Sequence, residues 1–182
     1  QFLFRQETVV PVKGTPGRYE LDGYSKASRL SFYLWDAAPD RRLLAAAASG
    51  KLDTEKGLNE EVDRLLASPR LEDGVRSFFT DMFGFESFDS LAKDATLYPN
   101  FTRSVGDDGR EQTMRTLVDL LIAKKGDYRD LFTTRETFLT PVLGSMYRVP
   151  VTTNLPNGFP ENKWTRHEYE PNDPRAGILT QI

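Results

Sequence analysis

The single histidine of the chain, His167, is its one side chain that ordinarily titrates near neutral pH. It lies between Trp164 and Tyr169, with Arg166 and Glu168 as its direct neighbours. An imidazole in this setting can act as an axial metal ligand or as a general base. We favour the simpler interpretation, a surface imidazole on an irregular segment, because no second histidine and no cysteine accompanies it as a ligand.

The residue counts exclude several kinds of chemistry on this chain. Its 182 residues contain one His and no Cys, which excludes disulfides, thiolate metal sites, a Cys nucleophile and covalent attachment of c-type haem. One His also excludes any metal site with two histidine ligands. The formal net charge of −3 argues against a protein dedicated to binding the phosphate backbone of nucleic acid.

Two further residues are candidates because of their chemistry and position. Arg29 can form a buried ion pair with Asp40 that joins the first two predicted helices, or it can bind a carboxylate or propionate group of a ligand. We favour the ion pair. Trp35 is expected in the hydrophobic core rather than as a platform for a ligand.

Acidic residues offer weaker candidates. Asp107 and Asp108 lack the spacing of a calcium loop and are expected to cap a helix N-terminus. Four carboxylates in an aromatic-rich stretch can in principle pair as the acid and base of a polysaccharide hydrolase, although solvated helix faces explain them better. These are Asp81, Glu86, Asp89 and Asp94.

Hydrophobic periodicity and capping residues predict the elements that must position these side chains. Apolar residues at helical spacing predict an all-α fold, an irregular bundle of about five to seven helices with a Pro-rich C-terminal arm. The predicted helices span residues 26–36, 41–49, 54–67, 71–84, 109–125, 128–132 and 141–147. Counted from Val75, Phe78, Phe79 and Phe83 lie at positions i+3, i+4 and i+8, which place them on one face of a helix. These phenylalanines are predicted to form the centre of the core.

Glycine and proline mark the predicted domain boundaries. Residues 1–23 are predicted to be the tail of a preceding segment and a linker, 24–149 a helical domain, and 150–182 an arm and the start of an adjoining domain. The apolar residues at both ends predict a piece of a longer polypeptide. The longest uncharged stretch, 149–160, has 12 residues, too few for a membrane span.

Several sequence blocks resemble a known family of proteins. Residues 28–35 (SRLSFYLW) form the most specific block, and weaker blocks follow in the same order as in the family. The weaker ones are Pro39-Asp40, Leu43-Leu44, Ala47, residues 50–52, 65–70, 98–101, 137–139, 147–150 and 175–181. Together they resemble the large, multi-domain, envelope-associated proteins of planctomycetes and related bacteria that carry a cytochrome-c-like module. The resemblance covers residues 24–182, and residues 175–181 resemble the opening of the domain that adjoins it.

The resemblance implies a periplasmic or cell-envelope location and an exported protein. It implies no reaction, and any c-type haem belongs to a missing segment or a partner, because this chain has no cofactor or metal motif of its own. The resulting hypothesis is a non-catalytic structural and interaction module. Its expected partners are other domains of the same polypeptide or a cytochrome-type protein, without nucleic acid.

The alternative hypothesis is that the chain is part of an enzyme, either a haem-linked oxidoreductase or a polysaccharide-active hydrolase. Its site would lie between the bundle and the arm. The candidate contact residues for either hypothesis are Arg29, Trp35, Trp164, His167 and Arg175.

Overall fold

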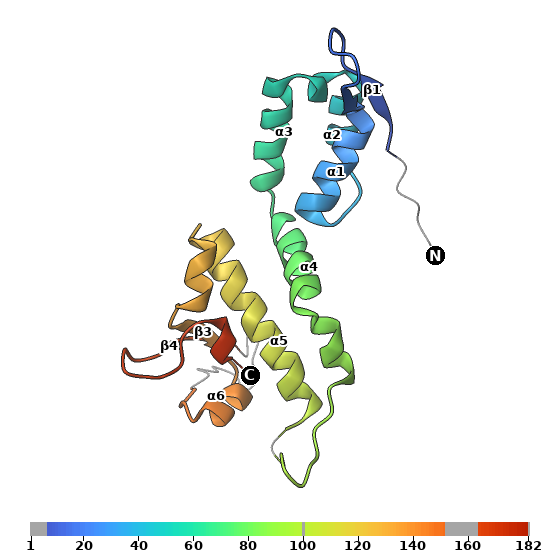
Figure 1. Cartoon of the computed structure of the whole chain (residues 1–182). Helices are drawn as coiled ribbons and strands as arrows, with labels where there is room; N and C mark the ends of the chain where they lie inside the picture. Colours follow the sequence, from blue (N-terminus) through green and yellow to red (C-terminus); the bar gives the residue numbers. More distant parts are fainter. Residues whose placement is uncertain (1–6, 100, 152–163, 182) are drawn as a thin grey trace. The chain divides into compact units, whose positions relative to one another are not determined.

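The computed structural model describes residues 7–99, 101–151 and 164–181, and the chain divides into two units, residues 1–78 and 79–182. The predicted tail at residues 1–6 and most of the first half of the predicted arm lie outside the described residues. Each unit is considered by itself (Figure 1).

The first unit begins with a β-hairpin in the region predicted to be a linker. Strand β1 (Val9–Pro11) pairs antiparallel with β2 (Tyr19–Leu21), and Val9 lies opposite Leu21. Within the connecting loop, the amide of Arg18 donates to the carbonyl of Thr15. Pro16 and Gly17 occupy the two central positions of this turn, and Gly17 has the positive φ of 81° that a type II turn requires there. The glycines and prolines that predicted a loop therefore form the turn of a hairpin.

Three helices of the first unit begin at side-chain caps. They are α1 (Gly23–Trp35), α2 (Arg41–Ala48) and α3 (Glu55–Leu66). The side chains of Asp22, Asp40 and Thr54 each accept a hydrogen bond from a backbone amide in the first turn. The caps at Asp40 and Thr54 confirm the predicted starts, whereas α1 begins three residues before the predicted start. A short 3-10 helix, η1 (Lys51–Asp53), connects α2 to α3, and α4 (Leu71–Phe83) follows.

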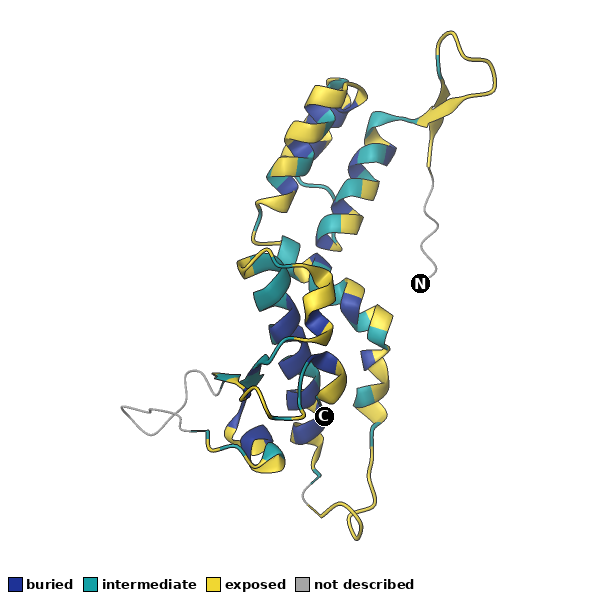
Figure 2. Cartoon of the chain, turned by 60° about the vertical axis from the view of Figure 1, so that its left-hand side comes forward, coloured by how far each residue is buried: buried dark blue, intermediate teal, exposed yellow. Residues whose placement is uncertain are grey.

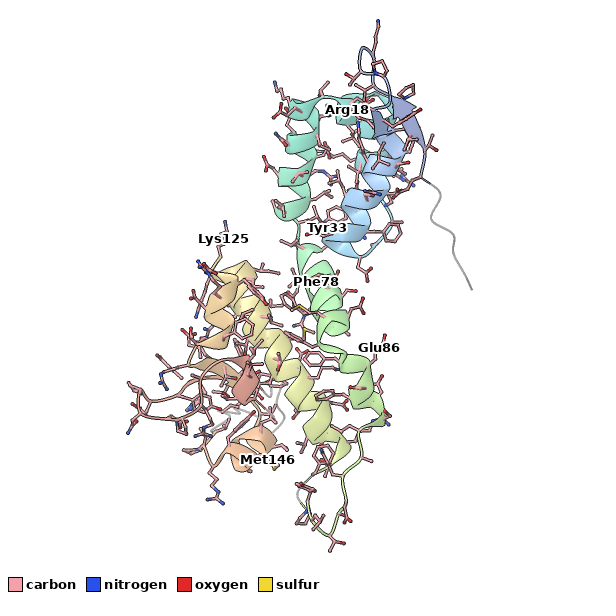
Figure 3. The ribbon with its side chains drawn as sticks, in the orientation of Figure 1. Arg18, Tyr33, Phe78, Glu86, Lys125 and Met146 are labelled. Carbon is pink, nitrogen blue, oxygen red and sulfur yellow. The ribbon has the colours of Figure 1, made fainter. Side chains whose placement is uncertain are left out.

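The core of the first unit forms where α1, α2 and α3 face one another (Figure 2). Its buried residues are Ala27, Trp35, Leu43, Ala46, Ala47, Leu52 and Leu65. The alanines of α2 allow close packing, as predicted, because a Cβ at Gly23 of α1 would come within 2.9 Å of the Ala47 carbonyl oxygen. Tyr33, near the end of α1, is 80% exposed (Figure 3).

The second unit combines helices with a second antiparallel pair of strands. After α4 come the 3-10 helix η2 (Phe85–Ser90), α5 (Arg103–Val118), the π-helical turn η3 (Asp119–Ala123) and the 3-10 helix η4 (Tyr128–Phe132). Strand β3 (Glu136–Leu139), α6 (Pro141–Tyr147), β4 (Thr165–Glu168) and the short 3-10 helix η5 (Ile178–Thr180) complete it. β3 packs against α5, and Thr137 of β3 lies opposite His167 of β4 (Figure 1).

The all-α prediction is wrong, because each unit contains a two-stranded antiparallel sheet. β1 and β2 have three residues each, and β3 and β4 have four, which is too short for the alternation of a strand to stand out from helical patterns. β4 lies in the predicted arm, and its partner β3 was not predicted. The pairing of β3 with β4 is non-local, so periodicity within one segment could not predict it.

The longest helix also begins earlier than predicted. α5 starts at Arg103, so Asp108 lies within it rather than at its N-terminus. Asp108 is buried, and its carboxylate accepts a 2.8 Å hydrogen bond from the Thr140 hydroxyl. Thr140 in turn caps α6 by accepting from the Leu143 amide. The carboxylate therefore links α5 to the start of α6, and the predicted N-capping role of Asp108 is wrong.

The predicted phenylalanine core is only partly confirmed. Phe79 is buried and its ring stacks on Phe83 at 5.6 Å between centroids, and Phe85 is also buried. Phe78, by contrast, is 58% exposed. A second buried cluster in this unit consists of Val105, Leu139 and Leu143. The aromatic group is therefore one part of the packing and not its centre.

The adjacent phenylalanines of α4 form a matched pair for a stability test. Phe79→Ala should lower the free energy of unfolding by about 3–5 kcal/mol, because it removes a buried ring and leaves a cavity. Phe78→Ala should lower it by less than about 1 kcal/mol, since this ring is largely in water. Urea denaturation of the two variants measures both values, and equal losses would contradict the burial described here.

Candidate functional site

Arg29 does not form the predicted ion pair with Asp40. On α1, its Nε and Nη2 donate to the two carboxylate oxygens of Glu7, each at 2.6 Å. Asp40 instead accepts two hydrogen bonds from Arg64, at 2.8 and 3.1 Å. The guanidinium of Arg29 thus already forms a bidentate pair with a carboxylate of this chain. A ligand carboxylate would need the same geometry.

Trp35 lies in the core of the first unit, as predicted. Its indole Nε1 donates a 3.0 Å hydrogen bond to the Leu65 carbonyl oxygen. The guanidinium of Arg70 lies 4.4 Å from the centroid of the indole ring, and that of Arg64 lies at 5.6 Å. These cation–π contacts stabilise the indole ring in addition to its packing in the core. The indole therefore joins α1 to the end of α3.

A buried carboxylate next to this tryptophan was missed by the sequence reasoning. The side chain of Glu61, on α3, is only 1% exposed. Its oxygens contact Arg64 Nε at 2.7 Å, Lys51 Nζ at 3.1 Å and Arg42 Nε at 3.4 Å. Since Arg64 also binds Asp40, the network connects α2, η1 and α3. No local pattern in α3 signals this burial, because Arg42 and Lys51, two of the three cations, lie outside the helix.

The network sets the charge state of its acids. Burial by itself would raise the pKa of Glu61, but hydrogen bonds from Arg64 and Lys51 outweigh it and hold the pKa below its ordinary value of 4.5. The pKa of Asp40 is lowered in the same way: burial opposes the shift, and the hydrogen bond from Arg64 and that from the Leu43 amide dominate. Both groups are therefore anionic at neutral pH.

Replacing the buried carboxylate should show how much the first unit depends on it. Glu61→Gln leaves three cations without their common partner and should lower the free energy of unfolding by about 2–4 kcal/mol. Glu60→Gln is the control, because Glu60 is exposed and its pair with Lys51 lies at the surface. This variant should lose less than about 1 kcal/mol of the free energy of unfolding.

The wild type and Glu61→Gln should also differ in how their stability depends on pH. A lowered pKa in the folded state gives stability that is present above pH 4.5, the unfolded value, and that is lost as the pH falls through the folded value. Below pH 4.5 the wild type should therefore lose stability more steeply than Glu61→Gln. Chemical denaturation at a series of acidic pH values measures this, and parallel curves would contradict the proposed role of Glu61.

In the second unit, His167 and Arg175 meet at a buried tyrosine. The ring of Tyr169, which is 6% exposed, contacts the imidazole edge-to-face at 4.9 Å between centroids. The guanidinium of Arg175 lies 4.4 Å from the centroid of the same ring, and the ring of Tyr147 packs edge-to-face against it at 6.4 Å. We call Tyr147, His167, Tyr169 and Arg175 the tyrosine cluster.

The charge of Arg175 is neutralised within the chain. Its Nε and Nη2 donate to the two oxygens of Asp173 at 2.8 and 2.6 Å, and its Nη1 donates to the Tyr147 carbonyl oxygen at 2.7 Å. The hydrogen bonds from the Arg175 side chain and amide lower the pKa of Asp173 to about 2. The guanidinium thus ties the arm to the end of α6, which is a structural use of its donors.

The hydroxyl of Tyr169 is buried and makes no hydrogen bond within the described part of the chain. Burial raises its pKa to about 12, so the phenol is protonated at neutral pH and is a poor proton donor. An acid with this pKa is not matched to acid–base catalysis near neutral pH. The tyrosine cluster as it stands is therefore suited to packing.

Removing this hydroxyl should stabilise the protein. Tyr169→Phe is expected to raise the free energy of unfolding at neutral pH by about 1 kcal/mol, because a buried hydroxyl without a partner is removed. The raised pKa also means that wild-type stability is complete below pH 10, the unfolded value, and is lost as the pH rises toward 12. The variant should lose less over this range. Denaturation at neutral and alkaline pH measures both effects, and a destabilised variant would indicate an important role for the hydroxyl.

Trp164 packs in a different place from the tyrosine cluster. It borders the cluster of Val105, Leu139 and Leu143, and the guanidinium of Arg115 lies 5.0 Å from its ring centroid. Its neighbours on α5 and β3 make it part of the packing between these two elements. Arg29 and Trp35 belong to the first unit, and Trp164, His167 and Arg175 belong to the second.

The end of the arm is anchored in the second unit by a polar network. The side chain of Gln181 accepts from the Thr113 hydroxyl at 2.7 Å and donates to those of Thr137 and Thr116 at 3.2 and 3.3 Å. Thr137 also accepts a 2.8 Å hydrogen bond from Gln112, whose side chain is fully buried. These contacts join residues from α5, β3 and the arm in one network, which we call the amide–threonine network.

A glycine allows the same segment to lie close to the backbone at Phe132 and Thr134. The Gly177 amide donates to the Thr134 carbonyl at 2.7 Å, and its φ is 71°. A Cβ at this position would come within 2.2 Å of the Phe132 carbonyl oxygen. Only glycine allows both this backbone conformation and this approach.

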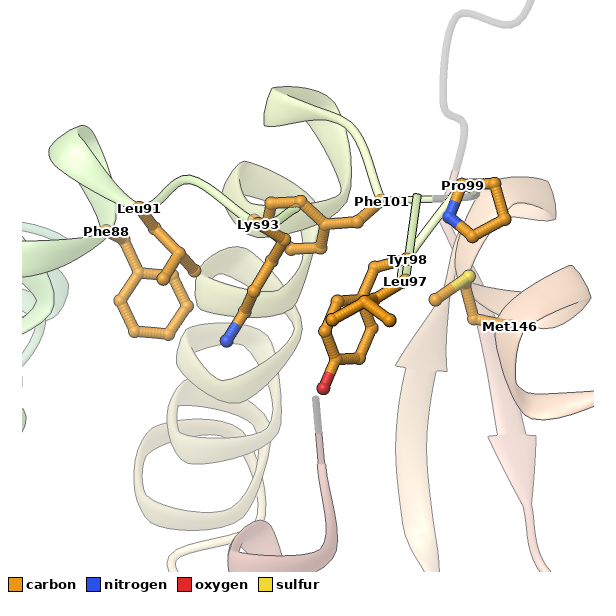
Figure 4. A pocket seen from close by; sticks show the side chains of 9 residues that line it. Phe88, Leu91, Lys93, Leu97, Tyr98, Pro99, Phe101 and Met146 are labelled. Atoms are coloured by element: carbon orange, nitrogen blue, oxygen red, sulfur yellow. The ribbon is translucent and has the colours of Figure 1, made fainter. Parts of the chain in front are cut away.

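An apolar pocket of the second unit lies elsewhere, and the sequence reasoning missed it. It has a volume of about 570 Å³ and its lining is mostly apolar (Figure 4). Phe88, Leu91, Leu97, Tyr98, Pro99, Phe101 and Met146 line it, together with Gly106 and Lys93. We call it the apolar pocket. The sequence signal was the turn at residues 98–101, which was noted as a block of the resemblance but not as a surface.

The four carboxylates considered for hydrolase chemistry are exposed. Asp89 lies 3.6 Å from Arg110, and Asp94 caps the Thr96 amide. Across the described ranges, no group of three or more metal-ligating side chains comes together. The helices described within those ranges include none with the length and apolar character needed to cross a bilayer.

Comparisons with known proteins identify the family. Neither the curated proteins nor the solved structures contain a match to the chain. A family profile, described as PSD4, protein of unknown function (DUF1592), matches residues 21–149. The match includes the most specific block of the resemblance, residues 28–35, and it stops before the arm that carries His167 and Arg175. The chain belongs to the PSD4 (DUF1592) family of proteins of unknown function.

Proposed function

We propose that the chain is a non-catalytic structural and interaction module of a larger exported protein associated with c-type haem. Its role is to hold the segment that leads into an adjoining domain. Haem belongs to another segment or to a partner, since covalent attachment needs cysteines and this chain has none. The periplasmic or envelope location and the cytochrome-type partner come from the resemblance of residues 24–182.

The observation that carries the proposal is the anchoring of residues 175–181. This segment resembles the opening of an adjoining domain, and three of its residues are anchored to other elements of the unit. Arg175 binds Asp173 and the end of α6, Gly177 packs on the backbone of Phe132, and Gln181 enters the amide–threonine network. A segment held by this many contacts transmits its orientation to whatever follows it, which is what a positioning module requires.

The proposal is tested by releasing the segment with one methyl group. Gly177→Ala should displace residues 176–181, because its Cβ overlaps the Phe132 backbone, and should lower the free energy of unfolding by about 3 kcal/mol. Gly14→Ala is a matched control: Gly14 has a similar φ of 84°, but nothing lies within 4 Å of the added Cβ, so only about 1 kcal/mol is expected.

The measurement is made on the longer native protein. Hydrogen exchange should show residues 176–181 losing protection in Gly177→Ala and keeping it in Gly14→Ala. Small-angle scattering should then show a changed spacing between the neighbouring domains in the first variant. Released residues with unchanged spacing would contradict a positioning role. His167→Ala separates the enzyme alternative, because a lost activity in the native protein with its Soret band retained would favour an enzyme.

A further inference from the structure

We propose that the apolar pocket of the second unit binds an amphipathic carboxylate, with its acyl chain between the aromatic walls and its head group at Lys93. The proposal is independent of the positioning function, because none of the pocket residues belongs to the arm. It rests on the shape, the lining and the single charge of the pocket.

The pocket has the size and chemistry of a small-molecule site. Its volume of about 570 Å³ lies within the range of roughly 300–1,000 Å³ usual for such sites. Phe88 and Leu91 form one wall, Leu97 and Tyr98 the opposite wall, and Phe101 lies between them (Figure 4). Walls of this kind favour an unbranched hydrocarbon chain through burial of apolar surface.

Large apolar side chains of the pocket are left in water. Leu97 is 72% exposed and Tyr98 is 55% exposed. Gly106 of α5 contributes open space to the lining, since a Cβ there would meet only Phe101 at 3.8 Å and Leu91 at 4.0 Å. A bound acyl chain would cover the exposed side chains and fill this space.

The charge of the lining selects the head group. Lys93 contributes one positive charge, and no Asp or Glu is among the lining residues. Its ammonium lies 5.8 Å from the centroid of the Tyr98 ring, and the ammonium and the Tyr98 hydroxyl point to the same side of the pocket (Figure 4). The acid next in sequence, Asp94, accepts from the Thr96 amide. An ammonium and a hydroxyl directed to the same side of a pocket are donors suited to one carboxylate.

The test uses dodecanoate, with dodecanol and dodecyltrimethylammonium as matched ligands of the same chain length, each below its micelle concentration. Titration of the protein with isotope-labelled methionine methyl groups gives a site-specific signal, because the chain has three methionines. The Met146 methyl should shift saturably with dodecanoate, while those of Met82 and Met114 serve as internal references. Dodecyltrimethylammonium should bind more weakly than dodecanoate.

Three variants make the test decisive. Gly106→Leu fills the pocket from α5 without a backbone clash and should weaken binding at least about tenfold. Leu97→Asp, at an exposed position that leaves folding intact, should do the same. Lys93→Met should weaken dodecanoate about fivefold and leave dodecanol unchanged, whereas Lys13→Met, in the hairpin loop of the first unit, should change neither.

Several results would overturn the proposal. One is the absence of a saturable Met146 shift, and another is binding that Gly106→Leu and Leu97→Asp leave unchanged. Equal affinity for the three ligands, or an unaltered affinity of Lys93→Met for dodecanoate, would overturn the assignment of the head group. Binding only to vesicles of anionic lipid, and not to monomeric dodecanoate, would show that the surface recognises a membrane instead.

Discussion

The second unit depends on a network of buried hydrogen bonds, because a buried polar group without a partner is destabilising. Gln112 is fully buried in the middle of α5, and its side chain donates to Thr137 of β3 and accepts from the Tyr147 hydroxyl. Gln181 completes the set by bridging three threonines. Each partner comes from a different element, so the network is satisfied only when α5, β3, α6 and the arm are assembled. Packing of apolar groups alone would accept several arrangements of these elements, whereas this pattern of donors and acceptors accepts very few.

In the first unit, a buried charge likewise has partners that stabilise it. Glu61 is buried because three cations replace its water, and the indole of Trp35 lies beside two of the arginines in the same region. The blocks by which the sequence resembles its family include Trp35, Asp40 and Lys51, and all three belong to these contacts. Packing and ion pairing therefore account for these three residues of the resemblance.

The sequence allowed local features to be predicted and failed on non-local ones. The caps at Asp40, Thr54 and Thr140, and the short helix at residues 128–132, were predicted because each signal lies within a few residues. The partner of Arg29, the burial of Glu61 and the pairing of β3 with β4 depend on residues far apart in the chain, and no periodicity reports them. Among the candidate site residues, the burial of Trp35 was predicted, whereas the apolar pocket was not, because its walls come from irregular segments.

The antiparallel pairing of β3 with β4 also affects the order in which the chain can fold. β3 (residues 136–139) can pair only after β4 (residues 165–168) has been synthesised, and the amide–threonine network can form only after Gln181 has. The core of the second unit is therefore incomplete until Gln181 has left the ribosome. The contacts of the first unit all lie within residues 7–78 and carry no such delay. During synthesis, α5 therefore emerges before Thr137, Tyr147 and Gln181, which bind its polar side chains, and in this interval the nascent protein is most exposed to chaperones and proteases.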